Sequence, residues 1–237
     1  MSAQSSSLLE RPESKLFNSA SGYDLVADYY DHWFWQEFWR KNEFPVLLRK
    51  LLDAAPRRSV LDVGVGTGAF LSYAAPCLSP QLRLVGLDIS SRMLGQARTR
   101  LGERVELLQV DLQQGLPLPD KSFDAVIMMR VANHLKNLSA VLCEIGRVLS
   151  SGGLFLATDL ADDYDYFCTR IPAPETKISI ETYKHGLTDW YRGLETNFLN
   201  VDIRDFTVSE LSEDVLLTSK SLAKDAAVFK LVTATRK

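Results

Sequence analysis

Residues 60–68 read Val60-Leu61-Asp62-Val63-Gly64-Val65-Gly66-Thr67-Gly68, a short apolar run followed by three glycines at alternate positions. A short apolar run bounded by turn residues is typical of a buried strand. Glycine is favoured where the backbone turns sharply or where a ligand approaches the main chain, because it has no Cβ. The stretch therefore predicts a strand that turns tightly into a helix, with a ligand site at the turn.

The rest of the chain alternates short apolar runs with helical patterns. Apolar runs predict strands at 59–63, 82–87, 105–110, 125–129, 154–158, 201–208 and 227–235. Helical stripes fall at 70–75, at 93–101 with Ser90 as N-cap, and at 135–149 with a stop near Gly152. This alternation predicts a doubly wound α/β fold with a mostly parallel sheet and helices on both faces.

The two ends of this core differ from it in pattern. Residues 1–22 are rich in Ser and charge and are expected to be flexible. Residues 23–55 predict an N-terminal helical cap, which Pro45 is expected to divide into two helices. Residues 56–158 form the expected ligand-binding core, 159–195 an aperiodic insertion that we interpret as a lid or pocket wall, and 196–237 the last strands.

Composition narrows the class of protein. The chain has 237 residues, 46% of them hydrophobic, which suits one compact domain. The formal net charge of -3 gives no electrostatic footprint for a polyanion, so we expect no nucleic-acid partner. No apolar run reaches the roughly 20 residues that span a bilayer, and no signal peptide is apparent, so we expect a cytoplasmic protein without a membrane partner. Nothing in the sequence indicates an oligomeric state.

The cysteines give no sign of a metal site. Cys77, Cys143 and Cys168 are far apart and follow no metal-ligand spacing. We expect no bound metal and, from the usual environment of free cysteine, mostly buried and reduced thiols.

Three acids follow successive strands of the predicted sheet. Asp62 lies inside the end of the first strand, Asp88 follows the second and Asp111 follows the third. Asp88 comes about 20 residues after the glycine turn, where a carboxylate accepts hydrogen bonds from both ribose hydroxyls of a nucleoside. Asp111 can accept from an adenine amino group, and Asp62 can orient water or backbone amides around a cationic amine. No diphosphate is required, so this set fits S-adenosylmethionine (SAM) better than NAD.

Several motifs resemble those of the class I, Rossmann-like SAM-dependent methyltransferases. Residues 60–68 resemble their first motif, Gly86-Leu87-Asp88-Ile89-Ser90 the second, and Gln109-Val110-Asp111-Leu112 the third. Segments 123–128, 132–135 and 147–153 resemble the fourth strand, the loop after it and the turn before the fifth strand. Tyr23-Asp24 and Tyr29-Tyr30-Asp31 match an N-terminal motif often seen in the small-molecule branch. The resemblance extends from Tyr23 to about Leu156.

This resemblance implies a seven-stranded sheet with an antiparallel last strand, and SAM lying across the strand ends. It implies that Gly64 and Gly66 pass close to the methionine and ribose, with Gly68 in the same cofactor-binding turn, that Ile89 packs on adenine, and that Asp111 and Leu112 meet the adenine edge. Tyr23 and Tyr30 would close over the methionine portion. Asp62, Asp88 and Met129 complete the expected cofactor-binding set. The chain departs from the family at Met128 and Met129, where serines are usual, and at Arg130, where an aromatic or aliphatic residue is usual.

The acceptor side offers fewer signals. His134, just after the fourth strand, is our first candidate for a catalytic base, with a helix-start or packing role as the alternative. His185, in a Lys- and Tyr-rich segment, is a second candidate for substrate contact, whereas His32 is expected to pack or to be solvated. Arg130 is expected either to bind a substrate carboxylate or phosphate or to pair with Asp159, Asp162 or Asp163. The aromatic run 33–39 either lines an acceptor pocket or is ordinary core.

The function expected from these observations is transfer of a methyl group from SAM to a small-molecule acceptor, with S-adenosylhomocysteine (SAH) as the product. Such catalysis needs chiefly alignment of the acceptor and exclusion of water. Three alternatives stay open: a methyltransferase that acts on a short peptide, an NAD(P)-dependent oxidoreductase, since Gly64, Gly66 and Ala69 also match the dinucleotide pattern, and a noncatalytic SAM-binding protein.

Overall fold

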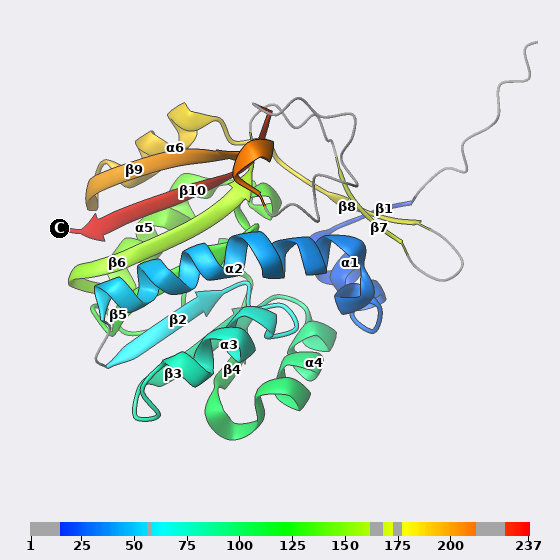
Figure 1. The fold of residues 1–237 in the computed structure, drawn as a ribbon, viewed down its shortest axis with the longest axis horizontal. Helices are drawn as coiled ribbons and strands as arrows, with labels where there is room; N and C mark the ends of the chain where they lie inside the picture. Colours follow the sequence, from blue (N-terminus) through cyan, green and yellow to red (C-terminus); the bar gives the residue numbers. More distant parts are fainter. Residues whose placement is uncertain (1–14, 56–57, 162–167, 173–176, 212–225) are drawn as a thin grey trace, which may run out of the picture.

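A computed structural model describes residues 15–55, 58–161, 168–172, 177–211 and 226–237. At its centre is a seven-stranded sheet, in the spatial order β4-β3-β2-β5-β6-β10-β9 (Figure 1). Its strands are β2 (Ser59–Val63), β3 (Arg83–Asp88), β4 (Glu106–Gln109), β5 (Phe123–Met129), β6 (Leu149–Leu160), β9 (Phe198–Thr207) and β10 (Ala227–Arg236). Strands β2 to β6 pair in parallel, and β10 runs antiparallel to both of its neighbours. The predicted α/β sheet with an antiparallel last strand is confirmed.

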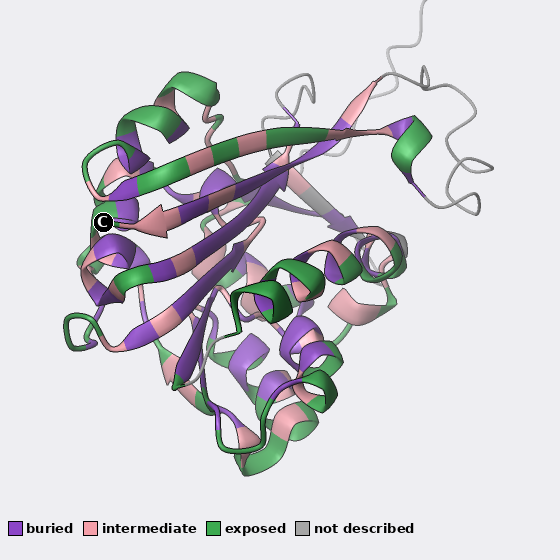
Figure 2. Cartoon of the chain, turned by 60° about the vertical axis from the view of Figure 1, so that its left-hand side comes forward, coloured by how far each residue is buried: buried purple, intermediate pink, exposed green. Residues whose placement is uncertain are grey.

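Helices cover both faces of this sheet. The α-helices around it are α2 (Phe34–Ala54), α3 (Ala69–Ala74), α4 (Ser91–Leu101), α5 (Leu138–Val148) and α6 (Leu187–Leu194). Adjacent strand residues point to opposite faces, so Val60 of β2 packs in the cluster with α2 and α3, whereas Leu61 packs in the cluster with α5 and α6. Figure 2 shows the result, with buried strands between helices whose outer surfaces are exposed.

Pro45 does not divide the cap where the sequence suggested. It lies inside α2, which continues through it, and the break falls earlier, between α1 (Ser19–Val26) and α2. A proline inside a helix costs about 3 kcal/mol. Phe44 and Leu47, on either side of Pro45, are fully packed in the core cluster on this face. Their burial offsets the cost of the proline and keeps both halves of the helix on the sheet.

A second, three-stranded sheet joins the N-terminal segment to the insertion. Its order is β1-β8-β7, and it contains β1 (Leu16–Phe17), β7 (Cys168–Pro172) and β8 (Lys177–Glu181). Gly22 of α1 lies so close to Ile180 of β8 that an added Cβ would stand 2.6 Å from its side chain. Residues 15–22, expected to be flexible, are therefore paired and packed in this structure, whereas residues 1–14 lie outside the described part.

Short 3-10 helices occupy several connections. They are η1 (Tyr30–His32), η2 (Ala75–Cys77), η3 (Gly102–Arg104), η4 (Leu112–Gln114), η5 (Ala132–His134) and η6 (Val208–Glu210). The expectation of mostly buried thiols is wrong for Cys77 and Cys143, which are exposed because they lie at the end of η2 and on the outer side of α5. The side chain of Cys168 is outside the described structure.

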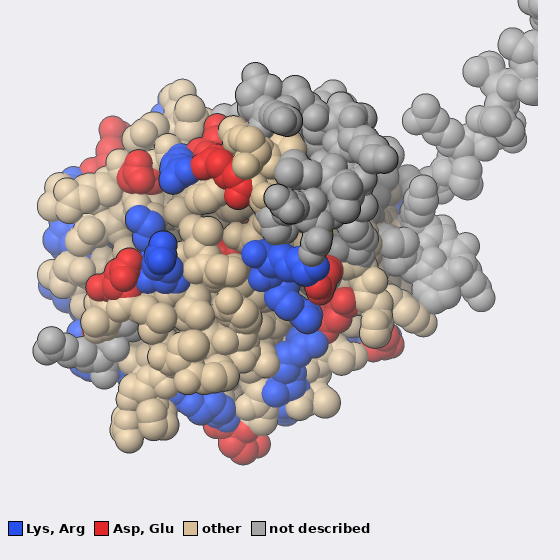
Figure 3. Space-filling model, viewed as in Figure 1, with Lys and Arg blue, Asp and Glu red and all other residues tan. Residues whose placement is uncertain are grey.

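The surface carries both signs of charge. Figure 3 shows Lys and Arg side chains next to Asp and Glu side chains on the face that α2 covers. Within the described residues, no helix combines the length and the apolar character that crossing a membrane requires.

The centre of β6 should be the part of the fold most sensitive to loss of volume. Phe155 is fully buried, and its ring centroid lies 5.6 Å from that of Phe198. We expect Phe155→Ala to lower the free energy of unfolding by about 3–5 kcal/mol, because it removes apolar contacts and leaves a cavity. Urea unfolding measures the change. Tyr191→Ala, at a side chain that is 47% exposed, is the control, and equal losses in the two variants would contradict the assigned core.

Candidate functional site

A cavity of about 480 Å³ opens at the carboxyl ends of the parallel strands. Its size lies within the range of about 300–1,000 Å³ that is usual for small-molecule sites. Most of the residues predicted to form the site line it: Tyr23, Tyr30, Gly64, Gly66, Asp88, Ile89, Asp111, Leu112, Met129, Arg130 and His134. Asp62, Gly68 and His185 do not line it.

The turn after β2 has the backbone conformation that its glycines indicate. Gly64, Gly66 and Gly68 have φ angles of 77°, 56° and 77°, in the region that L side chains rarely adopt. A Cβ at Gly64 would overlap the side chain of Val131, in the loop after β5. A Cβ at Gly66 would meet nothing within 4 Å. The first glycine thus permits close packing of two loops, and the second leaves open space at the cavity wall.

Asp88 connects the end of β3 to the glycine turn. Its Oδ2 accepts a hydrogen bond from the Gly66 amide at 2.8 Å, and its Oδ1 accepts one from the Ser90 amide at 2.9 Å. Burial raises the pKa of this carboxyl, and the backbone hydrogen bonds oppose the rise. Each carboxylate oxygen has more than one acceptor position. Asp88 can therefore hold the turn and still accept hydrogen bonds from a ligand.

The adjacent strand ends form a slot beyond Asp88. Asp111 follows β4, and its Oδ1 accepts a hydrogen bond from the Gln113 amide at 3.0 Å. Ile89 and Leu112 both line the cavity here and supply apolar surface. The combination suits a flat, apolar ring with a polar edge.

Asp62 lies beneath the turn and is fully buried. Among the described residues, neither of its carboxylate oxygens has a hydrogen-bond partner. Burial, and after it the charge of Asp88, raise the pKa of Asp62 to about 7, while the charge of Arg130 lowers it. A buried carboxyl without a donor is expensive unless it is neutral or receives a partner. Asp62 is therefore an acceptor beneath the turn that a proton or a buried water could satisfy.

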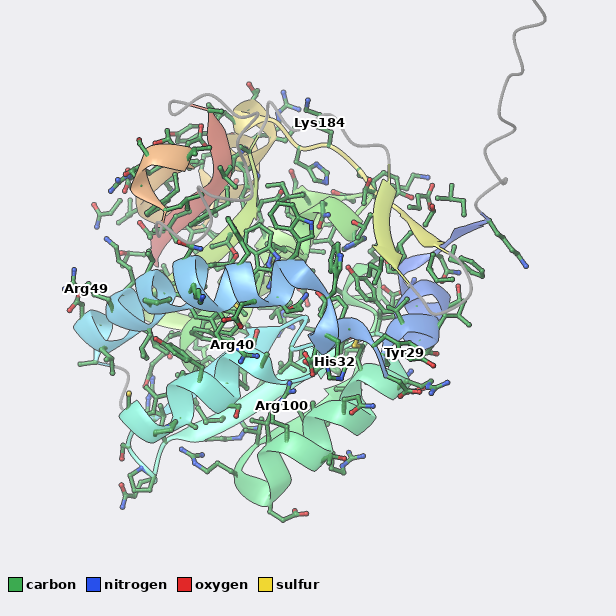
Figure 4. The ribbon with its side chains drawn as sticks, turned by 45° about the vertical axis from the view of Figure 1, so that its right-hand side comes forward. Tyr29, His32, Arg40, Arg49, Arg100 and Lys184 are labelled. Atoms are coloured by element: carbon green, nitrogen blue, oxygen red, sulfur yellow. The ribbon has the colours of Figure 1, made fainter. Side chains whose placement is uncertain are left out.

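Two networks attach the N-terminal cap to these loops. Thr67 donates to Asp31 at 2.8 Å, and Arg100 of α4 donates both to the Thr67 carbonyl oxygen and to Asp31. Ser90 donates to Asp24 of α1 at 2.6 Å. Figure 4 labels Arg100 on α4, facing the segment that carries His32. The charged cap residues thus hold the glycine turn and the start of α4 in place.

His134 lies between Tyr23 and the second sheet. Its Nε2 is 2.8 Å from the Tyr23 hydroxyl, and its Nδ1 is 3.2 Å from the Glu181 carbonyl oxygen. A carbonyl oxygen only accepts, so Nδ1 carries the proton and Nε2 accepts from the tyrosine. Burial lowers the pKa of His134 to about 4. The imidazole is therefore neutral at neutral pH.

Arg130 is held at the end of β5 in a left-handed conformation, with φ of 53°. Its Nε lies 3.1 Å from Oε2 of Glu43, a fully buried residue of α2, and its guanidinium lies 4.7 Å from the centre of the Trp39 ring. Burial raises the pKa of Glu43, and the charge of Arg130 opposes the rise. Among the described residues, the ion pair is therefore with Glu43 and not with Asp159. Residues 162 and 163 lie outside the described residues, so a pairing with them stays a prediction.

The other two histidines lie away from the cavity. The Nε2 of His185 donates to the Leu135 carbonyl oxygen at 2.7 Å, which attaches segment 182–186 to the loop after η5. His32 was expected either to pack or to be solvated, and its side chain is exposed. Trp33 and Trp39 line the cavity, and Trp39 also packs in the core. That this part of the cavity receives an acceptor stays a prediction.

Sequence reasoning missed several lining residues. Asn18, Ser19 and Ala20 line the cavity although they fall in the stretch expected to be flexible. Asn18 caps α1 by accepting from the Ser21 amide at 2.9 Å, a pattern that was readable from the sequence. The role of Glu43 could not be predicted from the sequence, because a single acidic residue in a long helix is usually exposed to solvent.

Comparisons with known proteins agree with this architecture. Residues 61–157 match the family described as a methyltransferase domain. The chain is 38% identical over 113 residues to a demethylmenaquinone methyltransferase of Tropheryma whipplei, covering 47% of this chain and 46% of the relative. It is 38% identical over 109 residues to a fatty-acid O-methyltransferase of Mycolicibacterium smegmatis, covering 46% and 39%. The chain thus spans less than half the length of these curated relatives.

A solved structure extends the likeness to the whole fold. A SAM-dependent methyltransferase of Mesorhizobium loti aligns with a TM-score of 0.63 at 20% identity, over 81% of this chain and 96% of that one. The fold is therefore that of the class I, Rossmann-like SAM-dependent methyltransferases. Within it, residues 61–157 are the part that matches the methyltransferase domain family.

The burial of Asp62 should appear in the pH dependence of stability. Its carboxyl titrates near pH 4 when unfolded and at about 7 when folded. Between these two pH values, the Asp62 carboxyl is deprotonated in the unfolded chain and still protonated in the folded one. The stability of the wild type relative to Asp62→Asn should therefore fall as pH rises from about 4 to about 7, by up to about 1.4 kcal/mol per pH unit. Urea unfolding across this range measures the difference, and a difference independent of pH would contradict the raised pKa.

Proposed function

We propose that the protein is an enzyme that transfers a methyl group from SAM to a small-molecule acceptor. The observation that carries the proposal is the carboxylate of Asp88, held by the Gly66 and Ser90 amides at the cavity wall, with Asp111 one strand further along. This arrangement suits the ribose and adenine of a nucleoside. The methyltransferase domain match and the names of the relatives support the same reaction type.

The residues present fit this cofactor. Asp62 is a buried acceptor beneath the glycine turn, without a partner among the described residues, and would orient water or backbone amides around a nearby ammonium group. Gly66 leaves open space where the cofactor's ribose and methionine portions would approach the backbone. Asp88 and Asp111 would hold the ribose and the adenine edge. When bound, SAM supplies an activated methyl group, which an acceptor atom attacks while the carbon–sulfur electron pair passes to sulfur.

The chain's own contribution is positioning and proton handling. Tyr23 and Tyr30 line the cavity from the cap and exclude water from its centre. The Nε2 of His134 accepts the Tyr23 hydroxyl proton, so this pair can take the proton that becomes acidic as the acceptor is methylated. Tyr23 would receive the acceptor proton on its oxygen as it passes its own proton to Nε2, and the imidazolium then releases that proton to solvent.

Calorimetric titration of the full chain with SAH and with NADH tests the cofactor. We expect SAH to bind and NADH not to bind, because the arrangement of acids in the site fits a nucleoside and does not require a diphosphate in the ligand. Incubation with methyl-labelled SAM and pools of small molecules or short peptides then tests transfer. Binding without transfer to any pool would favour a noncatalytic SAM-binding protein, and binding of NADH alone would favour an oxidoreductase.

Asp88 should control cofactor affinity. We expect Asp88→Asn to weaken SAH binding by about 10- to 100-fold, because hydrogen bonds from the ribose hydroxyls to a charged acceptor are replaced by weaker ones to an amide. Titration calorimetry gives the affinity, and thermal melting checks that the variant is folded. Asp53→Asn, at an exposed position of α2, is the matched control. Unchanged affinity in Asp88→Asn would place the nucleoside elsewhere.

The Tyr23–His134 pair should affect turnover and not cofactor binding. With the acceptor that the labelling assay identifies, we expect His134→Asn and Tyr23→Phe to lower kcat by about 10²-fold or more, the usual range for loss of acid–base help. The part of the wild-type pH profile that both variants remove should be an acid limb near pH 4, where the imidazole gains its proton. Removal of a limb near 6.5 instead, or full kcat in both variants, would exclude this pair from the mechanism.

A further inference from the structure

Arg130 is the only Lys or Arg among the residues that line the described cavity. The acidic residues Asp88, Asp111 and Glu181 contribute to the same wall, and His134 is neutral at neutral pH. A guanidinium at the wall of such a cavity can bind an anionic group of a ligand by charge and by hydrogen bonds.

The guanidinium lies on the side of the cavity opposite the proposed nucleoside site. It stacks on Trp39, whose ring centroid is 6.2 Å from that of Phe229 in β10, and the Arg130 amide donates to Thr158 of β6 at 2.8 Å. In the sheet, β6 and β10 lie on one side of β5, whereas β3 and β4, which carry Asp88 and Asp111, lie beyond β2 on the other. Arg130 therefore faces the space left for the acceptor.

The guanidinium still has donors to give. Its polar neighbours among the described residues are Glu43 and the hydroxyls of Tyr30 and Tyr23. A guanidinium has five N–H donors; Glu43 lies 3.1 Å from Nε, and the Tyr30 hydroxyl is a further hydrogen-bond partner. The side chain is 15% exposed although it is deep in the fold. Trp39 fixes the plane of the group, so its remaining N–H donors keep one orientation.

We propose that Arg130 binds a carboxylate group of the methyl acceptor by a paired hydrogen bond, which makes the substrate class apolar carboxylic acids. That the bound acid is a methyl acceptor rests on the proposed function; that Arg130 binds a carboxylate does not. A planar carboxylate matches the fork of a guanidinium. Trp33, Trp39 and Leu160 line the same region and provide contact for an apolar body.

The charge balance favours a single negative charge. Glu43 already offsets Arg130, and its fully buried carboxylate stays beside the guanidinium. A doubly charged phosphate would leave excess negative charge in this poorly solvated region, which carries a large desolvation cost. A singly charged carboxylate adds less excess negative charge than a phosphate does, and it can still accept two hydrogen bonds from the guanidinium.

The test compares charged ligands with neutral ligands of the same shape. Cinnamate, 4-phenylbutyrate and decanoate are titrated into the full chain by calorimetry and thermal shift, each beside its primary amide, with and without SAH. Phenyl phosphate serves as the doubly charged probe. We expect at least one acid to bind about 10- to 100-fold more tightly than its amide, as hydrogen bonds to charged groups would give.

Variants assign this preference to Arg130. Arg130→Gln should remove the difference in affinity between acid and amide. It should leave SAH affinity within about 2-fold, because Arg130 lies on the side of the cavity opposite the proposed nucleoside site. Because this variant leaves Glu43 buried without its partner, the double variant Arg130→Gln with Glu43→Gln gives the same comparison without an unpaired charge. Arg98→Gln, at an exposed position of α4, is the control and should keep the preference.

Several results would overturn the inference. They are equal binding of acids and amides, no binding of any acid at millimolar concentration, tighter binding of phenyl phosphate, and a tenfold or greater loss of SAH affinity in the double variant. The last would show that Arg130 holds the carboxylate of the cofactor instead. If the wild type binds acids over amides but does not bind SAH, the proposed function fails and the carboxylate site stands.

Discussion

The cavity depends on how closely two loops approach at the end of the parallel strands. Val131 occupies the place where a side chain on Gly64 would be, so the loop after β5 packs directly on the turn after β2. The same turn is bound from the other side, where its Gly66 amide donates to Asp88 at the end of β3. Because three strand ends are fixed against one another through this turn, the polar groups that they carry have defined positions.

Burial gives these polar groups different electrostatic roles. Asp62 is held beneath the turn with a raised pKa, while His134 has a lowered pKa and stays neutral. Arg130 stays charged because Glu43 lies beside it. Among the described lining residues, Asp88 and Asp111 lie on the side of β3 and β4 and Arg130 on the side of β6, as the proposed cofactor and acceptor sites require. The separation follows from the strand order, since β2 and β5 lie between the two groups.

The features that follow from local pattern could be predicted from the sequence. All seven strands of the main sheet appear at their expected places, as does the glycine turn with its acids. Features set by packing over long distances could not be predicted. Pro45 indicates a helix break, but burial of its neighbours overrides that preference. Strands β7 and β8 are short, and β8 pairs with β1, more than a hundred positions away, so no local periodicity reveals them. Glu43 is distinguished from other helical acids only by its contact with Arg130.

A crystal structure of the full chain with SAH would show whether the nucleoside binds in this cavity. We expect density for the nucleoside with both ribose hydroxyls on Asp88, adenine between Ile89 and Leu112, and the sulfur directed toward the space between His134 and Arg130. A nucleoside bound elsewhere, or a cavity that stays empty at saturating SAH, would contradict this expectation.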